Sequence, residues 1–233
     1  MSSVGPNFAH LHLQRPLYDP GPCRWQFPDP GLADERGFVG VGADLQPATL
    51  LGAYRHGLFP MPERLRRIGW WSPNPRGIVE FDQLHVSKSL RASCRRYEVR
   101  ANTCFRDVMT KCASTPRPGG WINAAFIDAY CTLYEMGWAQ SIETFSPAGE
   151  LIGGLYGIKI NNFFAGESMF STQTDASKVA LVALVEVLRR EGVTLLDVQW
   201  TTAHLVSLGA SDVARTRYLE RLAIAIEGDS GSD

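Results

Sequence analysis

The fold is decided by residues 162–200, NFFAGESMFSTQTDASKVALVALVEVLRREGVTLLDVQW. NFFAGES, at its start, has the aromatic and apolar content of a strand. The long middle part has helical periodicity, with Asp175 as the predicted N-cap and Gly192 as the stop signal. TLLDVQW, at its end, reads as a buried strand. The stretch therefore predicts a strand–helix–strand crossover between two parallel strands.

The segments around this crossover predict an antiparallel meander and further helices. Strands are expected at IVEF (78–81), YEVR (97–100), QSIETF (140–145) and ELIGGLYGIKI (150–160). Helices are expected at ATLLGAYRHG (48–57), SKSLRASCRR (87–96), TCFRDVMTKCAS (103–114), AAFIDAYCTLYEMG (124–137) and ARTRYLERLAIAIE (214–227). The predicted fold class is α+β, with a mixed, mainly antiparallel sheet flanked by helices.

The chain divides by composition into two unequal parts with a terminal segment at each end. Asp44 is the predicted cap of the first helix and Gly57 its stop, and a turn-rich linker begins at Trp70. The predicted organisation is an extended, partly disordered arm (1–26), a small N-terminal domain (27–70), a larger domain (71–227) and a polar tail (228–233).

The composition excludes several classes of protein. Of 233 residues, 45% are hydrophobic and 20% are charged, which excludes wholesale disorder, collagen and coiled coil. No apolar stretch approaches the roughly 20 residues that cross a bilayer, and no secretory signal is visible. The five cysteines form no CxxC pair, so neither a zinc site nor a disulfide framework is indicated. We expect a cytoplasmic protein that does not bind membranes.

Positive charge is concentrated in one segment. Residues 64–117 hold twelve Lys and Arg against four Asp and Glu, although the whole chain has a net charge of −1. Such asymmetry indicates either a polyanionic partner or a solvated basic face. Within the segment, one helical stripe that could follow RNA phosphates is formed by Lys88, Arg91, Arg95 and Arg96.

Carboxylates interrupt the two strands of the crossover. Strand alternation predicts that Leu195, Asp197 and Gln199 share one face, while Glu167 and Ser168 interrupt an apolar strand. A carboxylate in such surroundings is rarely buried without a partner. Each acid therefore indicates either a site or an ion pair with Lys or Arg that ties strands together.

Other motifs exclude several reactions. There is no phosphate-binding G-x-x-x-x-G-K-[ST] loop, no G-x-S-x-G elbow and no dinucleotide-binding loop. The glycines of GELIGGLYG indicate a bulge or a close backbone approach. Trp121 and the Trp70–Trp71 pair lie in predicted turns, where they either stack on bases or cover a small core.

The chain resembles the leucyl/phenylalanyl-tRNA–protein transferase family. The resemblance rests on blocks in family order: GVGADLQPATLLGAYRHGLFPM, WWSPNPRG, LHVSKSL, GGWINAAFIDAY, ELIGGLYG, FAGESMFS, DASKVAL and LLDVQWTTAHLVSLGA. It implies transfer of Leu, Phe or, less readily, Met from aminoacyl-tRNA to the α-amino group of proteins that begin with Arg or Lys, which marks them for degradation. It also implies a GCN5-related N-acetyltransferase-like (GNAT-like) larger domain, no cofactor and no metal.

The resemblance also assigns roles to residues. It implies Asp197 and Gln199 as the catalytic pair, with Glu167 helping to hold the reacting groups. For the apolar pocket of the donor side chain it implies Leu155, Phe164, Met169 and Leu196. Around the terminal adenosine and the acceptor it implies Tyr54, Trp121 and Tyr130. The family's usual aromatic after Phe-Pro is Met61 here, and its H-S-I-E appears as Gln140 to Glu143.

Two other functions remain open on the residues alone, an acyl-CoA-dependent N-acetyltransferase and a non-catalytic tRNA-binding module. The acetyltransferase would need a pyrophosphate-binding Gly loop, which is missing from the sequence, and the module would not need the three polar residues. We expect a monomer.

Overall fold

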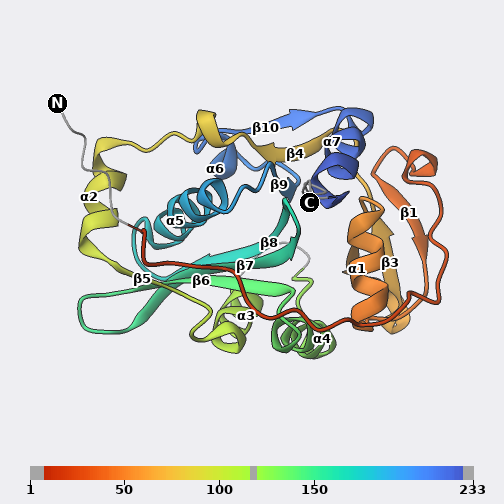
Figure 1. Cartoon of the computed structure of the whole chain (residues 1–233), viewed down its shortest axis with the longest axis horizontal. Coiled ribbons are helices and arrows are strands. Elements are labelled where there is room, and N and C mark those ends of the chain that lie inside the picture. Colours follow the sequence, from red (N-terminus) through yellow and green to blue (C-terminus); the bar gives the residue numbers. More distant parts are fainter. Residues whose placement is uncertain (1–7, 116–119, 228–233) are drawn as a thin grey trace, which may run out of the picture.

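A computed structural model describes residues 8–115 and 120–227 of the chain (Figure 1). The strands are β1 (Phe38–Val41), β2 (Phe59–Pro62), β3 (Ile68–Trp71), β4 (Arg76–Val79), β5 (Glu98–Ala101), β6 (Ala139–Phe145), β7 (Leu151–Ile160), β8 (Phe163–Ser171), β9 (Leu195–Gln199) and β10 (Ala210–Val213). The α-helices are α1 (Pro47–Arg55), α2 (Lys88–Arg96), α3 (Phe105–Ser114), α4 (Ala124–Glu135), α5 (Ala176–Arg190), α6 (Ala203–Val206) and α7 (Arg215–Glu227).

The larger sheet has seven strands in the order β10-β4-β9-β8-β7-β6-β5. Its β8–β9 pair is parallel and its other pairs are antiparallel. The α+β class, the meander and the crossover through α5 are therefore confirmed. The helix of the crossover forms because its apolar side chains are buried along nearly its whole length.

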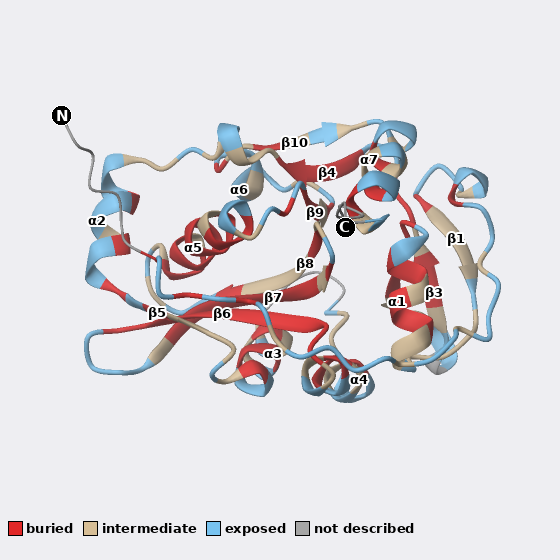
Figure 2. Ribbon diagram, in the orientation of Figure 1, coloured by how far each residue is buried: buried red, intermediate tan, exposed pale blue. Residues whose placement is uncertain are grey.

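Helices cover both faces of this sheet. One buried cluster joins α5 and α2 to one face, while a second joins α3, α4, α7 and the small domain to the other. Because both faces are covered, every residue of β6, which lies next to the edge strand β5, is buried (Figure 2). β7 approaches the start of α5 so closely that a Cβ at Gly153 would overlap Ala176. The bulge or close approach expected from the glycines is confirmed, since the β7–β8 register also shifts after Tyr156.

The small domain contains a sheet that the sequence did not predict. β1, β3 and β2 pair in that order, and α1 packs beside them (Figure 1). The strands have four residues each, and FVGV, FPMP and IGWW contain Gly or Pro where alternation would be needed. The sequence did not predict β10 either, because that strand is equally short. Because β3 ends at Trp71, we propose that the boundary between the domains follows that strand.

Of two predicted helix caps, Asp44 is wrong, and Asp175 is confirmed in position but makes no capping hydrogen bond with its side chain. Asp44 lies two residues before the N-cap position of α1, and its carboxylate accepts from Gln46 N and Thr49 Oγ1 instead. Asp175 occupies the N-cap of α5 with a φ of 65°, but its carboxylate accepts no hydrogen bond from a backbone N–H of the helix. It accepts a hydrogen bond from Ser93 Oγ and pairs with Lys178.

The described part of the predicted arm, from residue 8, runs extended along the body and is anchored there. Phe8, Leu11 and Leu13 are buried in the cluster around α5. Leu13 N donates to Glu191 Oε1 at 2.8 Å, and Trp138 Nε1 donates to the Tyr18 carbonyl at 2.9 Å. Residues 1–7 and the polar tail lie outside the described residues.

Candidate functional site

The candidate site lies where the two parallel strands separate. Pairing between β8 and β9 ends at Ala165 and Asp197. Immediately afterwards each strand has one extra residue relative to its antiparallel neighbour, Glu167 against β7 and Val198 against β4. Bulges turn strands away from each other and re-aim their side chains. A cavity of about 430 Å³ opens at this point.

The walls of the cavity are mostly apolar. β7, β8, β9 and α5 contribute Leu155, Met169, Leu196, Val198, Leu181 and Leu184. The small domain contributes Phe59, Pro60 and Met61, and the rim carries Trp121, Trp200 and His204. The volume lies within the roughly 300–1,000 Å³ of small-molecule sites. Such walls favour an apolar guest over a polar one.

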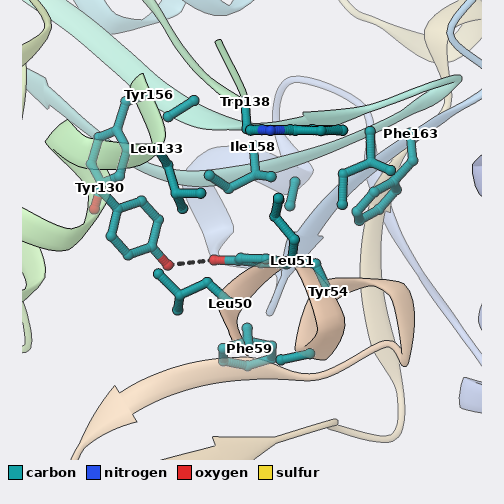
Figure 3. Close-up of a cluster of buried hydrophobic side chains, with 14 of the residues drawn as sticks. Leu50, Leu51, Tyr54, Phe59, Tyr130, Leu133, Trp138, Tyr156, Ile158 and Phe163 are labelled. Carbon is teal, nitrogen blue, oxygen red and sulfur yellow. Dashed lines mark hydrogen bonds between the residues drawn. The ribbon is translucent and has the colours of Figure 1, made fainter. Parts of the chain in front are cut away.

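The polar end of the cavity is formed by Glu167 and Gln199. Gln199 Nε2 donates to Glu167 Oε1 at 3.1 Å, and the Tyr130 hydroxyl donates to Glu167 Oε2 at 3.2 Å. The Tyr130 hydroxyl is also hydrogen-bonded to that of Tyr54, which joins α4 to α1 through the buried core (Figure 3). These contacts fix the carboxylate at the point where the apolar walls end.

Burial controls the ionisation of this group. Removal from water raises the pKa of Glu167 to about 7, against the opposing effect of its tyrosine hydrogen bonds and of Arg76. Burial, reinforced by the Glu167 charge, raises the pKa of the Tyr54 and Tyr130 hydroxyls well above their ordinary range. Near neutral pH the carboxyl is therefore half ionised, while both tyrosines stay neutral donors.

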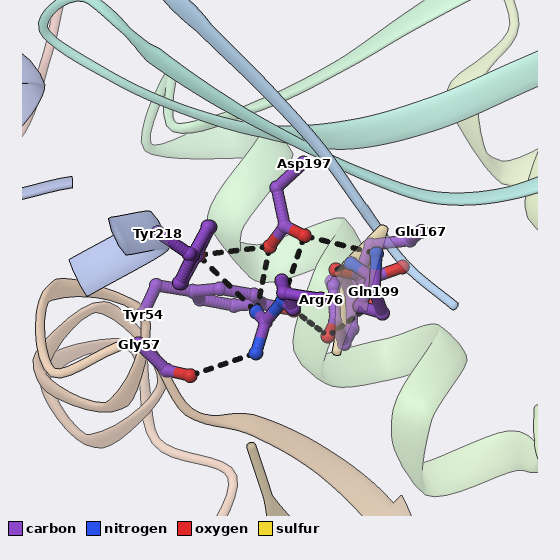
Figure 4. Close-up of polar contacts among 8 residues, drawn as sticks. Tyr54, Gly57, Arg76, Glu167, Asp197, Gln199 and Tyr218 are labelled. Carbon is purple, nitrogen blue, oxygen red and sulfur yellow. Dashed lines mark hydrogen bonds and ion pairs between the residues drawn. The ribbon is translucent and has the colours of Figure 1, made fainter. Parts of the chain in front are cut away.

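Asp197 is fully buried and paired with Arg76. Arg76 Nε and Nη2 donate to Asp197 Oδ1 and Oδ2 at 2.8 and 2.7 Å, and the Tyr218 hydroxyl donates to Oδ2 at 3.0 Å (Figure 4). Asp197 does not line the cavity. The alternative of an ion pair that ties strands together therefore describes Asp197 in this structure, while its role in catalysis stays a prediction.

The expectation that Leu195, Asp197 and Gln199 share one strand face is also wrong. Leu195 packs in the cluster on the α7 side, and Asp197 points to the same side, toward Tyr218. The bulge at Val198 and a φ of 59° at Gln199 then bring the Gln199 side chain to the cavity. The Gln199 N–H donates to Asp197 Oδ1 at 2.9 Å, which holds this turn.

The other predicted contact residues divide into two groups. Leu155, Met169, Leu196 and Trp121 line the cavity. Phe164 lies in the core cluster around α5, and Tyr54 and Tyr130 stand behind Glu167 rather than on the wall. Sequence reasoning missed the aromatic wall that Phe59 and Trp200 form. Phe59 belongs to the small domain and Trp200 to the loop after β9, and the sequence does not reveal that these two segments meet.

The basic stripe lies on α2, at the far end of the sheet from the small domain (Figure 1). The N-cap prediction for this helix is confirmed, since Leu90 N donates to Ser87 Oγ at 3.1 Å. Leu90 and Cys94 are buried, whereas Lys88, Arg91, Arg95 and Arg96 lie on the outer side of the helix. None of these four takes part in the ion pairs found among residues 8–115 and 120–227.

The part of the chain that the structure describes contains neither a cluster of metal ligands nor a membrane-spanning helix. Within it, no group of three or more His, Cys, Asp or Glu side chains could hold a metal ion. No helix of that part combines the length and the apolarity needed to span a bilayer.

Comparison with known proteins gives consistent matches over most of the chain. The family profile "Leucyl/phenylalanyl-tRNA protein transferase" matches residues 78–223, and the profile of its N-terminal domain matches residues 43–74. The transferase of that name from Myxococcus xanthus (strain DK1622) is 46% identical over 206 residues, which is 86% of this chain and 88% of its own. That of Aromatoleum aromaticum (strain DSM 19018 / LMG 30748 / EbN1) is 47% identical over 196 residues, 82% of each chain.

Solved structures are more remote. A tandem GNAT protein from the clavulanic acid biosynthesis pathway aligns with 73% of this chain and 57% of its own, at a TM-score of 0.36 and 12% identity, which is too distant to bear on the fold. The family profiles and the relatives at nearly half identity are decisive: the chain belongs to the leucyl/phenylalanyl-tRNA–protein transferase family.

Proposed function

We propose that this protein transfers Leu, Phe and, less readily, Met from aminoacyl-tRNA to the α-amino group of proteins that begin with Arg or Lys. The observation that carries the proposal is the apolar cavity that ends on Glu167 and Gln199. An aminoacyl ester has the matching form, with an apolar side chain on one side of its α-carbon and a reactive carbonyl on the other. Family membership supports the same reaction.

The donor side chain is proposed to enter between Leu155, Met169 and Leu196. These residues come from three adjacent strands, so they form a continuous wall rather than a single contact. Methionine adapts to irregular shapes, which suits a pocket that accepts both branched and aromatic side chains. Trp121 and Trp200, at the rim, are available to stack on the terminal adenosine.

The reaction needs the acceptor amine to be positioned and deprotonated. The neutral amine attacks the ester carbonyl, a C–N bond forms, and the bond from that carbon to the ribose oxygen breaks. One amine proton must move to this oxygen. An α-amine has a pKa of about 7.7–8.0, so a carboxylate with a pKa of about 7 is well matched to accept the proton and return it.

Glu167 is therefore the proposed proton acceptor in this chain, and Gln199 the group that orients the amine. Because Gln199 Nε2 donates to Glu167, the amide oxygen is the atom that can accept an N–H of the incoming amine. Asp197 then acts through Gln199, whose backbone it holds, and not by contact with the substrate. An anionic site also suits an acceptor whose first residue is Arg or Lys.

The tRNA body is proposed to contact the exposed stripe on α2. Each contact of Lys or Arg with a phosphate displaces condensed counterions, so affinity gained there depends on salt. Lys88, Arg91, Arg95 and Arg96 supply sequence-independent attraction, while the cavity selects the amino acid. We further propose that the protein acts as a monomer in the cytoplasm.

A four-way transfer assay tests this function. Leucyl-tRNA and alanyl-tRNA, each with a labelled amino acid, are offered to two peptides that differ only in beginning with Arg or with Ala. We expect efficient transfer in the combination of leucyl-tRNA with the Arg peptide. Equal transfer to both peptides, or from both donors, would contradict the proposal. Binding of tRNA without any transfer would instead indicate a non-catalytic tRNA-binding module.

A further inference from the structure

Among the described residues, Arg76 is the largest fully buried side chain, and the mechanism above does not use it. Its guanidinium is fully buried, between β4, β9, α7 and the end of α1 (Figure 4). Besides the two bonds to Asp197, Nη1 donates to the Gly57 carbonyl at 3.0 Å and Nη2 donates to the Tyr218 hydroxyl at 3.2 Å. The guanidinium also lies over the rings of Tyr218 and Phe59, at 4.3 and 4.9 Å from their centroids.

These contacts reach two parts of the cavity wall, one from each domain. Gly57 belongs to the small domain and lies two residues before Phe59, which lines one wall. Asp197 accepts from the backbone N–H of Gln199, which lines the other. A left-handed φ is unfavourable for glutamine, so the Gln199 backbone needs a specific partner to hold it.

We propose that Arg76 is a positioning residue for aminoacyl transfer: it sets the spacing between the Phe59 wall and Gln199 by holding the Gly57 carbonyl and the Asp197 carboxylate at once. The inference rests on the proposed function. The proposed function concerned the groups that meet the substrate. The inference adds a buried cation that lies behind those groups and links the two domains.

The geometry requires arginine rather than any cation. The fork of Nε and Nη2 binds both carboxylate oxygens, and Nη1 is still left for the carbonyl on the other side. A lysine ammonium is a single point charge, so it can approach Asp197 or Gly57 but cannot span the two in the same way. Arg76→Lys therefore keeps the positive charge but no longer fixes the distance between the Asp197 carboxylate and the Gly57 carbonyl.

The test is the single-turnover rate of leucine transfer to an Arg peptide, measured per folded molecule. We expect Arg76→Lys to lower this rate about 10–100-fold, because a misplacement of about 1 Å can cost about 10²-fold. The apparent affinity for leucyl-tRNA should change little, since the α2 stripe is distant. The matched control is Arg221→Lys. Arg221 also binds a carboxylate, that of Glu80, through two nitrogens, but neither Arg221 nor Glu80 lines the cavity.

A double-mutant cycle separates positioning from general stability. On a Gln199→Ala background, Arg76→Lys should cost less than about 3-fold in rate, because the group that it positions is already gone. If Arg76→Lys does not fold, Tyr218→Phe replaces it in the cycle. That variant keeps the ring beside the guanidinium and removes one hydrogen bond to Asp197. We expect it to lower the transfer rate about 3–10-fold, and we expect this effect to vanish on the Gln199→Ala background.

Two results would overturn the inference. One is an Arg76→Lys enzyme that loses thermal stability but keeps the wild-type rate, as Arg221→Lys should. The other is a rate loss that is equally large with and without Gln199. If the wild-type protein itself transfers no leucine, the proposed function fails instead, and the two failures are thereby distinguished.

Discussion

Glu167→Gln should stabilise the fold at alkaline pH while it removes most of the transfer activity. The variant replaces a half-buried carboxylate by a neutral amide of nearly the same shape. Burial raises the pKa of Glu167 from its ordinary 4.5 to about 7. An unfolded carboxyl ionises at the ordinary value, so the native state is progressively penalised as the pH rises from about 4.5 to about 7, and the full penalty is present above that.

The size of the effect follows from this pKa change. One pKa unit corresponds to about 1.4 kcal/mol, so the rise from 4.5 to about 7 sets an upper value of about 3 kcal/mol. Because the side chain retains some exposure, we expect a gain of about 1–3 kcal/mol in the free energy of unfolding at pH 8. Near pH 4.5 the two proteins should differ by less than about 0.5 kcal/mol.

Urea denaturation at pH 4.5 and pH 8 measures the stability difference, and single-turnover transfer measures the activity. If Glu167 accepts the amine proton, its replacement should lower the rate by about 10²–10⁴. The wild-type kcat/KM should rise with pH as Glu167 ionises around pH 7, and it should level off only above about pH 8, where the acceptor α-amine is also mostly neutral.

A matched control is Glu143→Gln. Glu143 is a fully buried carboxylate whose pKa is also raised by burial, and it is held by Ser141 and Thr103 away from the cavity. Its replacement should leave the transfer rate per folded molecule unchanged. Two results would refute the reasoning: a Glu167→Gln protein that is no more stable than the wild type at pH 8, or one that transfers leucine at the wild-type rate.

Three further predictions address the ion pair, the donor pocket and the basic helix. Asp197→Asn leaves the buried Arg76 guanidinium without its counter-charge, so the variant should lose about 3–5 kcal/mol of stability and also have a lower kcat. Both quantities are measured on one preparation, and a stable variant with the wild-type kcat would contradict both the structural and the positioning role of Asp197. Met169→Ala should weaken the discrimination in kcat/KM between leucyl and alanyl donors by about 1–3 kcal/mol without changing the affinity for the tRNA body. Equal effects on both donors would argue against a contact between Met169 and the donor's side chain. Replacing Arg95 and Arg96 with Ala should reduce the slope of log affinity against log salt by about 0.9 for each phosphate that is no longer neutralised, and an unchanged slope would leave α2 as a solvated face.

The elements that sequence predicted correctly are those whose signals are local. The α5 helix has an apolar face long enough to be recognised, and the N-cap Ser87 of α2 is a short-range pattern. The strands β1, β2 and β3 are four residues long and are held by pairing between distant segments. No local pattern encodes such pairing, so those strands could not be predicted.

The site divides in the same way. Glu167 and Gln199 stand out as polar residues at the ends of buried strands, and both line the cavity. The alternation rule placed Gln199 on the wrong face, because the bulge at Val198 depends on how β9 pairs with β4. Arg76 lies 121 residues before Asp197 in the chain, so their pairing, and with it the buried position of Asp197, became visible only in three dimensions.

The central claim is that the donor's side chain occupies the apolar cavity while its carbonyl lies beside Glu167 and Gln199. It is tested most directly by a crystal structure with an adenosine that carries phenylalanine through a 3′-amide in place of the ester. The account predicts that the phenyl ring contacts Leu155 and Met169, and that the amide carbonyl carbon lies within reach of an amine held by Gln199. A phenyl ring bound outside this cavity, or a carbonyl turned away from Glu167, would contradict it.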